Sequence, residues 1–330
     1  MADGLRRRDF RVKNLDVSGQ ATGNIGGLKT PNKVWYVDGS QITGVSGDGT
    51  TWDEAFLTIT EAMAVVGEND IVYVAAKEIT DYTGDPTSYA ETVIIPYAAA
   101  GMALIGVYRG QTQGGLPQIK IGSGSTALLT VRAPGCLIAN IGFNGASSTG
   151  GGILLDDDYA AKAAFGTTIE GCHFKNCVVT TKTAASGGAI YTTSAGNAWQ
   201  VTIRNNYFYK NECDIVLVGT SSTRPQNWII SDNVFSGPAA SVNCNLYLAG
   251  GSGINGVIID NNIFPCDPAL ASGDTDECVV LTGCVGVYSR NMHGFTGLTL
   301  GDGTVTGGTI PTTVFMVANY QEDAIITRTS

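Results

Sequence analysis

The chain has 330 residues, of which 44 are glycine and 15% are charged, and its formal net charge is −10. This acidic balance argues against a nucleic-acid partner, because binding to phosphates needs a basic patch. No stretch approaches the roughly 20 apolar residues of a membrane span, and the first ten residues lack the apolar centre of a secretion signal. We therefore expect no secretion signal and no membrane partner.

Residues 1–33 form the first predicted segment, a polar and glycine-rich arm. It has too few apolar residues to build a core of its own, so it is either a disordered terminus or an anchor that a partner orders. Under the second interpretation its basic run and alternating apolar residues make the contact. These candidate anchor residues are Arg6, Arg7, Arg8, Phe10, Val12, Leu15 and Val17.

A strand at 34–37 and a helix at about 51–66 come next. Thr51 and Glu54 have the spacing of a capping box, and apolar residues at helical spacing follow, with Gly67 as the stop. We expect this helix to cap the solenoid that follows, because an uncovered solenoid end exposes open strand edges. Further short strands are predicted at 71–75, 92–96, 102–107 and 118–122.

A repeated block, Ile-x-[Asn/Asp]-x-x-Phe, dominates the rest of the chain. Five copies align without gaps, and a sixth at 287–295 fits with one inserted residue. The phenylalanines recur at intervals of about 30 residues, a period typical of solenoids. They stand at positions 143, 174, 208, 235, 264 and 295.

Three columns of this block have distinct predicted roles. An isoleucine column should face inward on a strand, and the phenylalanine column should stack beneath it. Between them lies a column of residues that tolerate a left-handed turn, which we expect to form an amide ladder at the corner. The isoleucines are Ile138, Ile169, Ile203, Ile230 and Ile259, and the corner residues are Asn140, Gly171, Asn205, Asp232 and Asn261.

A second strand is predicted in each coil, at 213–219, 244–250 and 277–283, with looser relatives at 151–157 and 187–193. Cys213 and Cys244 should stack in neighbouring coils. The outward residues of this strand are apolar, and an exposed apolar β-face usually marks an interaction surface. We expect a homotrimer to cover it, although long loops of the chain could do the same. The candidate interface residues, here called the Val216 stripe, are Val216, Val218, Tyr247, Ala249 and Val280.

The run VWYVDGS…GDGTTWDEAFLTITEAMAVV…MALIGV, together with the repeated blocks, resembles the pectate-lyase-like right-handed β-helix superfamily. The resemblance covers about residues 34–300 and implies an all-β, right-handed parallel β-helix, with 301–330 as a C-terminal cap or tail. It does not imply one function, because the superfamily includes lyases, hydrolases, adhesins and viral tailspikes. The segment FRVKNLDVSGQAT also resembles the N-terminal arms of phage virion proteins.

Candidate catalytic groups are sparse. The acidic candidates are Asp156, Asp157, Asp158, Asp214, Asp232 and Asp260, and for each a surface, turn or ladder role is the favoured interpretation. His173 and His293 fall inside repeat blocks and are expected to be packed. None of the eight cysteines forms a CxxC pair, so we expect buried free thiols, no metal site and no cofactor.

The leading hypothesis is a structural protein on the surface of a bacteriophage particle, a capsid decoration or head-fibre protein whose arm binds another virion protein such as the major capsid protein. The main alternative is a tailspike-like polysaccharide depolymerase, a hydrolase or lyase using Asp156–Asp158 with Asp214. A third is an adhesin that binds a host surface glycan. Its stacking candidates are Tyr191, Trp199, Tyr207, Tyr209 and Tyr247.

Overall fold

The computed structural model describes most of the chain between residues 24 and 326. The described ranges are 24–25, 28–29, 32–41, 44–77, 88–107, 116–120, 127–145, 151–156, 164–177, 188–192, 198–217, 225–236, 244–248, 254–264, 279–293, 304–305, 308–309, 311–321 and 324–326.

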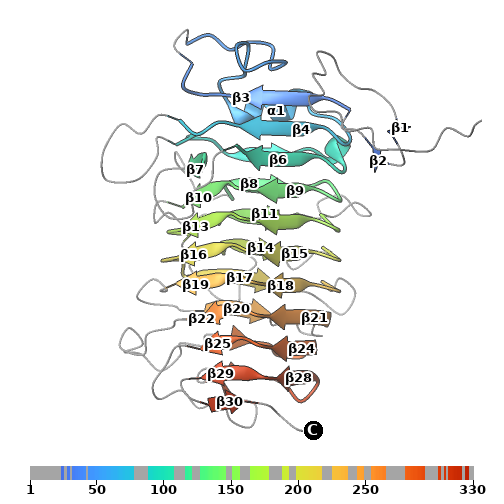
Figure 1. Ribbon diagram of the computed structural model, residues 1–330, viewed down its shortest axis with the longest axis vertical. Coiled ribbons are helices and arrows are strands. Elements are labelled where there is room, and N and C mark those ends of the chain that lie inside the picture. Colours follow the sequence, from blue (N-terminus) through green and yellow to red (C-terminus); the bar gives the residue numbers. More distant parts are fainter. Residues whose placement is uncertain are drawn as a thin grey trace, which may run out of the picture.

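Three long sheets run side by side along one elongated stack (Figure 1). Apart from the terminal strand β30, the strands of each sheet pair in parallel, and successive coils contribute successive strands. Each central coil visits the sheets in the same order, as β12, β13 and β14 do. This confirms the prediction of an all-β parallel β-helix.

The strands of the three sheets have the following bounds. The ten-stranded sheet contains β3 (Val34–Val37), β4 (Ile71–Val74), β6 (Ala103–Gly106), β9 (Leu137–Ala139), β12 (Thr168–Glu170), β15 (Thr202–Arg204), β18 (Ile229–Ser231), β21 (Asn255–Asp260), β24 (Val285–Ser289) and β28 (Val314–Val317). The nine-stranded sheet contains β7 (Gln118–Lys120), β10 (Gly142–Asn144), β13 (His173–Lys175), β16 (Tyr207–Tyr209), β19 (Val234–Ser236), β22 (Ile263–Phe264), β25 (Met292–His293), β29 (Asn319–Gln321) and the antiparallel β30 (Ala324–Ile326). The seven-stranded sheet contains β5 (Val93–Ile95), β8 (Leu129–Val131), β11 (Ile153–Leu155), β14 (Ile190–Thr192), β17 (Cys213–Leu217), β20 (Cys244–Leu248) and β23 (Val279–Val280).

Smaller elements lie outside these sheets. They are a 3-10 helix, Tyr97–Ala99, and two antiparallel pairs, β1 (Asn24–Ile25) with β2 (Leu28–Lys29) and β26 (Thr304–Val305) with β27 (Gly308–Thr309).

The N-terminal helix α1 spans Ile59–Val65, so the predicted start at about residue 51 was wrong. The helix contacts β3 and β5. Two Thr-x-x-Glu patterns lie in this part of the sequence, and the second one forms the capping box, between Thr58 and Glu61. The Glu91 carboxylate also accepts hydrogen bonds from the first helical N–H groups. Trp52 lies before the helix and packs against Tyr36, with ring centroids 4.7 Å apart. The capping role of α1 remains a prediction.

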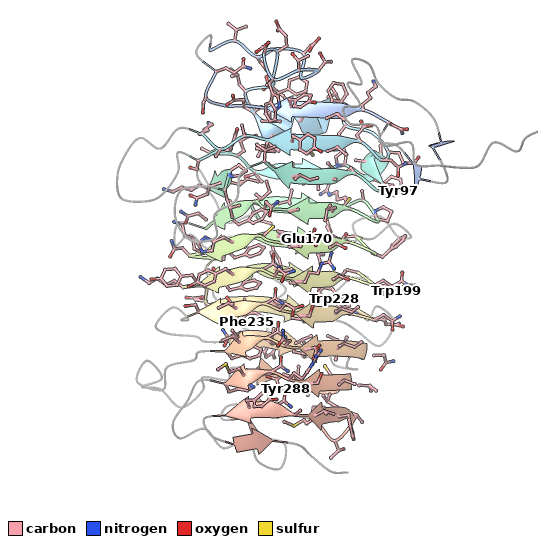
Figure 2. The ribbon with its side chains drawn as sticks, in the orientation of Figure 1. Tyr97, Glu170, Trp199, Trp228, Phe235 and Tyr288 are labelled. Atoms are coloured by element: carbon pink, nitrogen blue, oxygen red, sulfur yellow. The ribbon has the colours of Figure 1, made fainter. Side chains whose placement is uncertain are left out.

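The interior of the stack contains the predicted isoleucine column and a continuous column of aromatic rings. All five isoleucines of the column are fully buried. The rings from Phe143 to Phe264 stack with centroids 4.8–5.0 Å apart and interplanar angles of 11° or less. Figure 2 shows Trp228 and Phe235 within the stack and Trp199 at its edge.

The sixth repeat aligns with the others without the one-residue insertion expected from the sequence. His293 pairs in register with Phe264 and stacks on it at 5.0 Å, so it occupies the phenylalanine position. Phe295 lies outside the described residues. The repeat then continues into the segment that we predicted as a cap, because β28 and β29 pair in parallel with β24 and β25. The residues from 314 to 321 thus form the last parallel strands of these two sheets.

Candidate functional site: the corners and faces of the coils

The first corner of each coil, between the ten- and nine-stranded sheets, turns through one residue in the left-handed conformation. The corner residues of the repeat have φ between 54° and 63°, and the column extends to Arg290 and Ala318. Asparagine and glycine tolerate this region, which explains why they recur at the corner. The predicted turn role of this column is confirmed.

The amide ladder lies one residue further along the chain than predicted. Five buried asparagines form it, each no more than 2% exposed: Asn206, Asn233, Asn262, Asn291 and Asn319. The backbone N–H of each of the first four donates to the Oδ1 of the next, at 3.0 Å. Each Nδ2 also donates to a carbonyl of the preceding coil, at 3.0 Å.

The geometry of the turn explains this one-residue correction. A left-handed residue reverses the side to which the chain presents its side chains, so the corner residue faces outward and the next residue faces the interior. The outer column still makes local contacts, as where Asn261 Nδ2 donates to Asp232 Oδ1 at 2.7 Å. The buried asparagines thus satisfy backbone groups that water cannot reach.

Two acidic candidates lie on the seven-stranded side of the coils. Asp156 is buried and accepts a hydrogen bond from Arg132 Nε at 3.1 Å. Asp214 is 4% exposed and accepts from Asn211 Nδ2 at 2.9 Å and Asn245 Nδ2 at 2.7 Å. Burial raises the pKa of Asp214 from its ordinary 3.8 to about 7, although the two amide hydrogen bonds oppose this shift. Asp157 and Asp158 lie outside the described residues.

The register does not bring Asp156 and Asp214 together. Ile153 aligns with Ile190 and Ile190 with Ile215, which places Asp156 four residues beyond Asp214 along the strand direction and two coils away. Four residues of strand span about 13 Å. The carboxylates of glycoside hydrolases lie about 5–10 Å apart, so this pair lacks that geometry.

The acids at the corner take part in contacts between coils. Asp260 accepts hydrogen bonds from Ser289 Oγ at 2.7 Å and from Arg290 Nε at 2.9 Å, and the Arg290 contacts lower its pKa. Glu170 pairs with Arg204 in the same way, with Nε 2.7 Å from the carboxylate. These acids are therefore engaged in links between adjacent coils.

Both histidines are packed, as predicted. His173 is 7% exposed, and its ring lies edge-on to Tyr207 at 5.2 Å. His293 is 1% exposed, and its Nε2 lies 2.7 Å from the hydroxyl of Tyr288. Burial lowers the pKa of His293 to about 4, so the ring is neutral at physiological pH.

The aromatic residues considered for glycan stacking do not form one platform. Tyr191 is buried on the seven-stranded sheet, with Tyr247 partly buried beside it. Tyr207 and Tyr209 belong to the nine-stranded sheet, and Trp199 forms a bridge with Gln226 before the ten-stranded sheet. These residues therefore face different sides of the stack.

The Val216 stripe is less exposed than the sequence indicates. Val216 and Val280 are 1% and 5% exposed, and they form a small apolar cluster with Ala127, Tyr191 and Cys213 outside the main core. Val218 and Ala249 lie outside the described residues, as do all seven candidate residues of the N-terminal arm. The backbones of Cys213 and Cys244 pair in register in neighbouring coils, as the sequence predicts.

The described residues contain no group of three or more metal-binding side chains, and none of their helices is long and apolar enough to cross a membrane. The five cysteines whose side chains are described are buried and free. Burial raises the pKa to about 12 for four of them, which makes these thiols poor nucleophiles. These four are Cys136, Cys172, Cys177 and Cys284.

No protein family model and no curated protein matches the chain. Among solved structures it is similar to a pectate lyase from Bacillus sp. N165, with 16% identity, 94% of this chain and 89% of that chain covered, and a TM-score of 0.49. It is also similar to the Dettilon tailspike protein (15% identity, 78% and 54% covered, TM-score 0.35). A third structure is ORF18 of Geobacillus virus E2 (12% identity, 88% and 62% covered, TM-score 0.32). Likeness at this level concerns the fold alone.

Proposed function

We propose that the chain is a structural protein of a bacteriophage particle, a capsid decoration or head-fibre protein that displays a rigid β-helix on the particle surface. The observation that carries this proposal is the buried asparagine ladder, which links five coils through fully buried amides. Together with the ring column it makes a stiff rod. The polar residues of the repeat therefore serve the architecture.

The acidic side chains add support. Asp156, Asp214 and Asp260 each have a hydrogen-bonded partner within the stack, and the first two are too far apart for a hydrolytic pair. The proposed anchor is the arm at residues 1–33, and the proposed partner is another virion protein such as the major capsid protein. The displayed part is proposed to assemble as a homotrimer.

The composition of purified particles tests this role. Quantitative mass spectrometry should find the chain in a fixed ratio to the major capsid protein after stringent washing. Absence of the chain from particles would overturn the proposal. A charge-reversed arm, with Arg6→Glu, Arg7→Glu and Arg8→Glu together, should lower the incorporated ratio without changing the thermal midpoint of the purified chain.

The alternatives predict a different result. A tailspike-like depolymerase would release new reducing ends from host capsule or pectin-like polymers, whereas a structural protein or a glycan-binding adhesin would not. Binding of the same polymers without cleavage would favour the adhesin. The aromatic residues on three separate faces do not favour it, because stacking on a sugar chain needs a common platform.

A further inference from the structure

One outward column of the ten-stranded sheet contains no charged residue over its whole length. Each member pairs in register with the next, from the first strand of the stack to the last. We call this column the uncharged stripe. Its ten residues are Val34, Ile71, Ala103, Leu137, Thr168, Thr202, Ile229, Ile258, Val287 and Phe315.

The stripe is open to solvent in the single chain. All ten side chains are at least partly exposed, and the most exposed are Ile229, Ile258 and Phe315, at 39%, 43% and 53%. Their backbone neighbours in the isoleucine column are fully buried, so the stripe is the outer side of the same strands. Eight of the ten residues are apolar and the other two are threonine.

Within the described residues, neither of the other two sheets has an exposed apolar column of the same length. On the seven-stranded sheet Val216, Tyr191 and Val280 are already buried. On the nine-stranded sheet the outward column starts with Gln118, Gly142 and His173 and becomes apolar only in later coils. Its exposed apolar part is therefore short, with Ile263, Met292 and Tyr320 between 41% and 51% exposed. Lys120 and Lys175 flank it two residues further along the strands.

Charge also favours approach along the ten-stranded sheet. Copies of a chain with net charge −10 repel one another over most of their surface. Beside the uncharged stripe, however, the charges pair between coils, as Glu170 does with Arg204 and Asp260 with Arg290. This face is therefore close to neutral on an acidic molecule.

We propose that the uncharged stripe is the contact surface between parallel copies of this chain. Nine strand spacings of about 4.8 Å give a surface of about 43 Å, and four-residue strands give a width of about 13 Å, which includes the stripe and the paired charges beside it. Two such faces bury roughly 1,100 Å², above the threshold of about 1,000 Å² for a specific interface. A second copy presents the same surface with the same spacing of rungs. This inference gives the proposed oligomer a surface and does not depend on the virion role.

Ile258 and Ile263 provide a matched pair for the test. They belong to the same coil and have nearly equal exposure, 43% and 41%, but they lie on the ten- and nine-stranded sheets respectively. Sedimentation of the purified full chain should give a mass that is a multiple of 34.3 kDa. Ile258→Lys should weaken association by at least about 30-fold, because it buries a charge in an apolar contact. Ile263→Lys should leave the association constant within about threefold of wild type.

Thr202→Lys is the second variant, since it adds a charge at the middle of the stripe without removing a large apolar side chain. It should also dissociate the copies, and circular dichroism with the thermal midpoint checks that each variant is folded. A wild-type mass of 34.3 kDa at all concentrations overturns the proposal. So does a folded Thr202→Lys or Ile258→Lys chain that stays associated, or equal dissociation by Ile263→Lys. None of these outcomes bears on whether the chain is present in particles.

Discussion

The Oδ1 atom of Asn233 accepts two hydrogen bonds from Asn206, one from the backbone nitrogen at 3.0 Å and one from Nδ2 at 3.1 Å. Both residues are almost fully buried. One amide therefore satisfies two donors of the neighbouring coil, while its own Nδ2 bonds to the carbonyl of Ile203. The same exchange recurs from coil to coil and couples the corners along the stack.

Replacing one ladder amide should be strongly destabilising. Asn233→Ala leaves the backbone N–H of Asn206 and the carbonyl of Ile203 buried without these partners, and each such group costs about 1–3 kcal/mol. We expect a loss of about 3–5 kcal/mol in the free energy of unfolding, measured by urea denaturation. Asn261→Gly is the control, because its corner position has a φ of 54° that glycine adopts freely, and it should cost less than about 1 kcal/mol. Equal losses for the two variants would contradict the assignment of the ladder.

The ring column makes a second prediction. Phe235 stacks between Phe208 and Phe264, with centroids 4.8 Å away on both sides. Phe235→Ala removes the ring and leaves a cavity, which should cost about 3–5 kcal/mol. Phe235→Leu fills most of the space and should cost clearly less. A shift below about 1 kcal/mol for Phe235→Ala, in the same denaturation experiment, would show that the rings contribute little.

The fold follows from the sequence in its periodic parts. The isoleucine column and the inward residues of β17 and β20 were predictable because a two-residue spacing places side chains on one face of a strand. The ladder was misplaced by one residue because the pairs Asn205–Asn206 and Asn261–Asn262 present two asparagines each. Only the left-handed turn decides which of the two faces inward. In the earlier coils Ile141 and Cys172 occupy the ladder position, which hides the pattern further.

Other features depend on contacts that no local pattern encodes. Two Thr-x-x-Glu patterns are seven residues apart, and Glu91, distant in sequence, supports the helix that begins after Thr58. The outward face of β17 was predicted to be exposed, because the alternation of side chains along a strand shows which way each one points but not whether another segment covers it. Tyr191 and Ala127, from other coils, pack with Val216 there. His293 was not recognised as the sixth ring because imidazole replaces phenyl.

Lowering the pH should destabilise the stack through protonation of His293. Burial lowers its folded pKa to about 4, whereas an exposed histidine in the unfolded chain titrates near 6.5. The folded state thus binds fewer protons, and stability present above pH 6.5 is lost as the pH falls toward 4, by up to about 3 kcal/mol. The variant Tyr288→Phe with His293→Phe should lack this loss, while Tyr288→Phe alone should keep it. Identical pH profiles of the thermal midpoint for the two variants would refute the assignment.

Over a similar pH range, ionisation of Asp214 should change the stability of the fold in the opposite direction. Its folded pKa of about 7 exceeds the ordinary 3.8, so the folded state holds the proton more tightly than the unfolded chain. Stability is therefore highest at low pH and falls as the pH rises from 3.8 to 7, by up to about 4 kcal/mol. Asp214→Asn removes this dependence and should stabilise the chain at pH 8 relative to wild type. A variant that is less stable at pH 8, yet equal at pH 4, would contradict the shift.

Hydrogen exchange at single-residue resolution tests whether the buried ladder asparagines serve the architecture of the rod. The backbone N–H groups of Asn206, Asn233 and Asn262 donate to buried side-chain oxygens. We predict that they exchange among the slowest in the chain, with protection close to that of the isoleucine column. Exchange at the rate of a short unstructured peptide would contradict this role of the ladder.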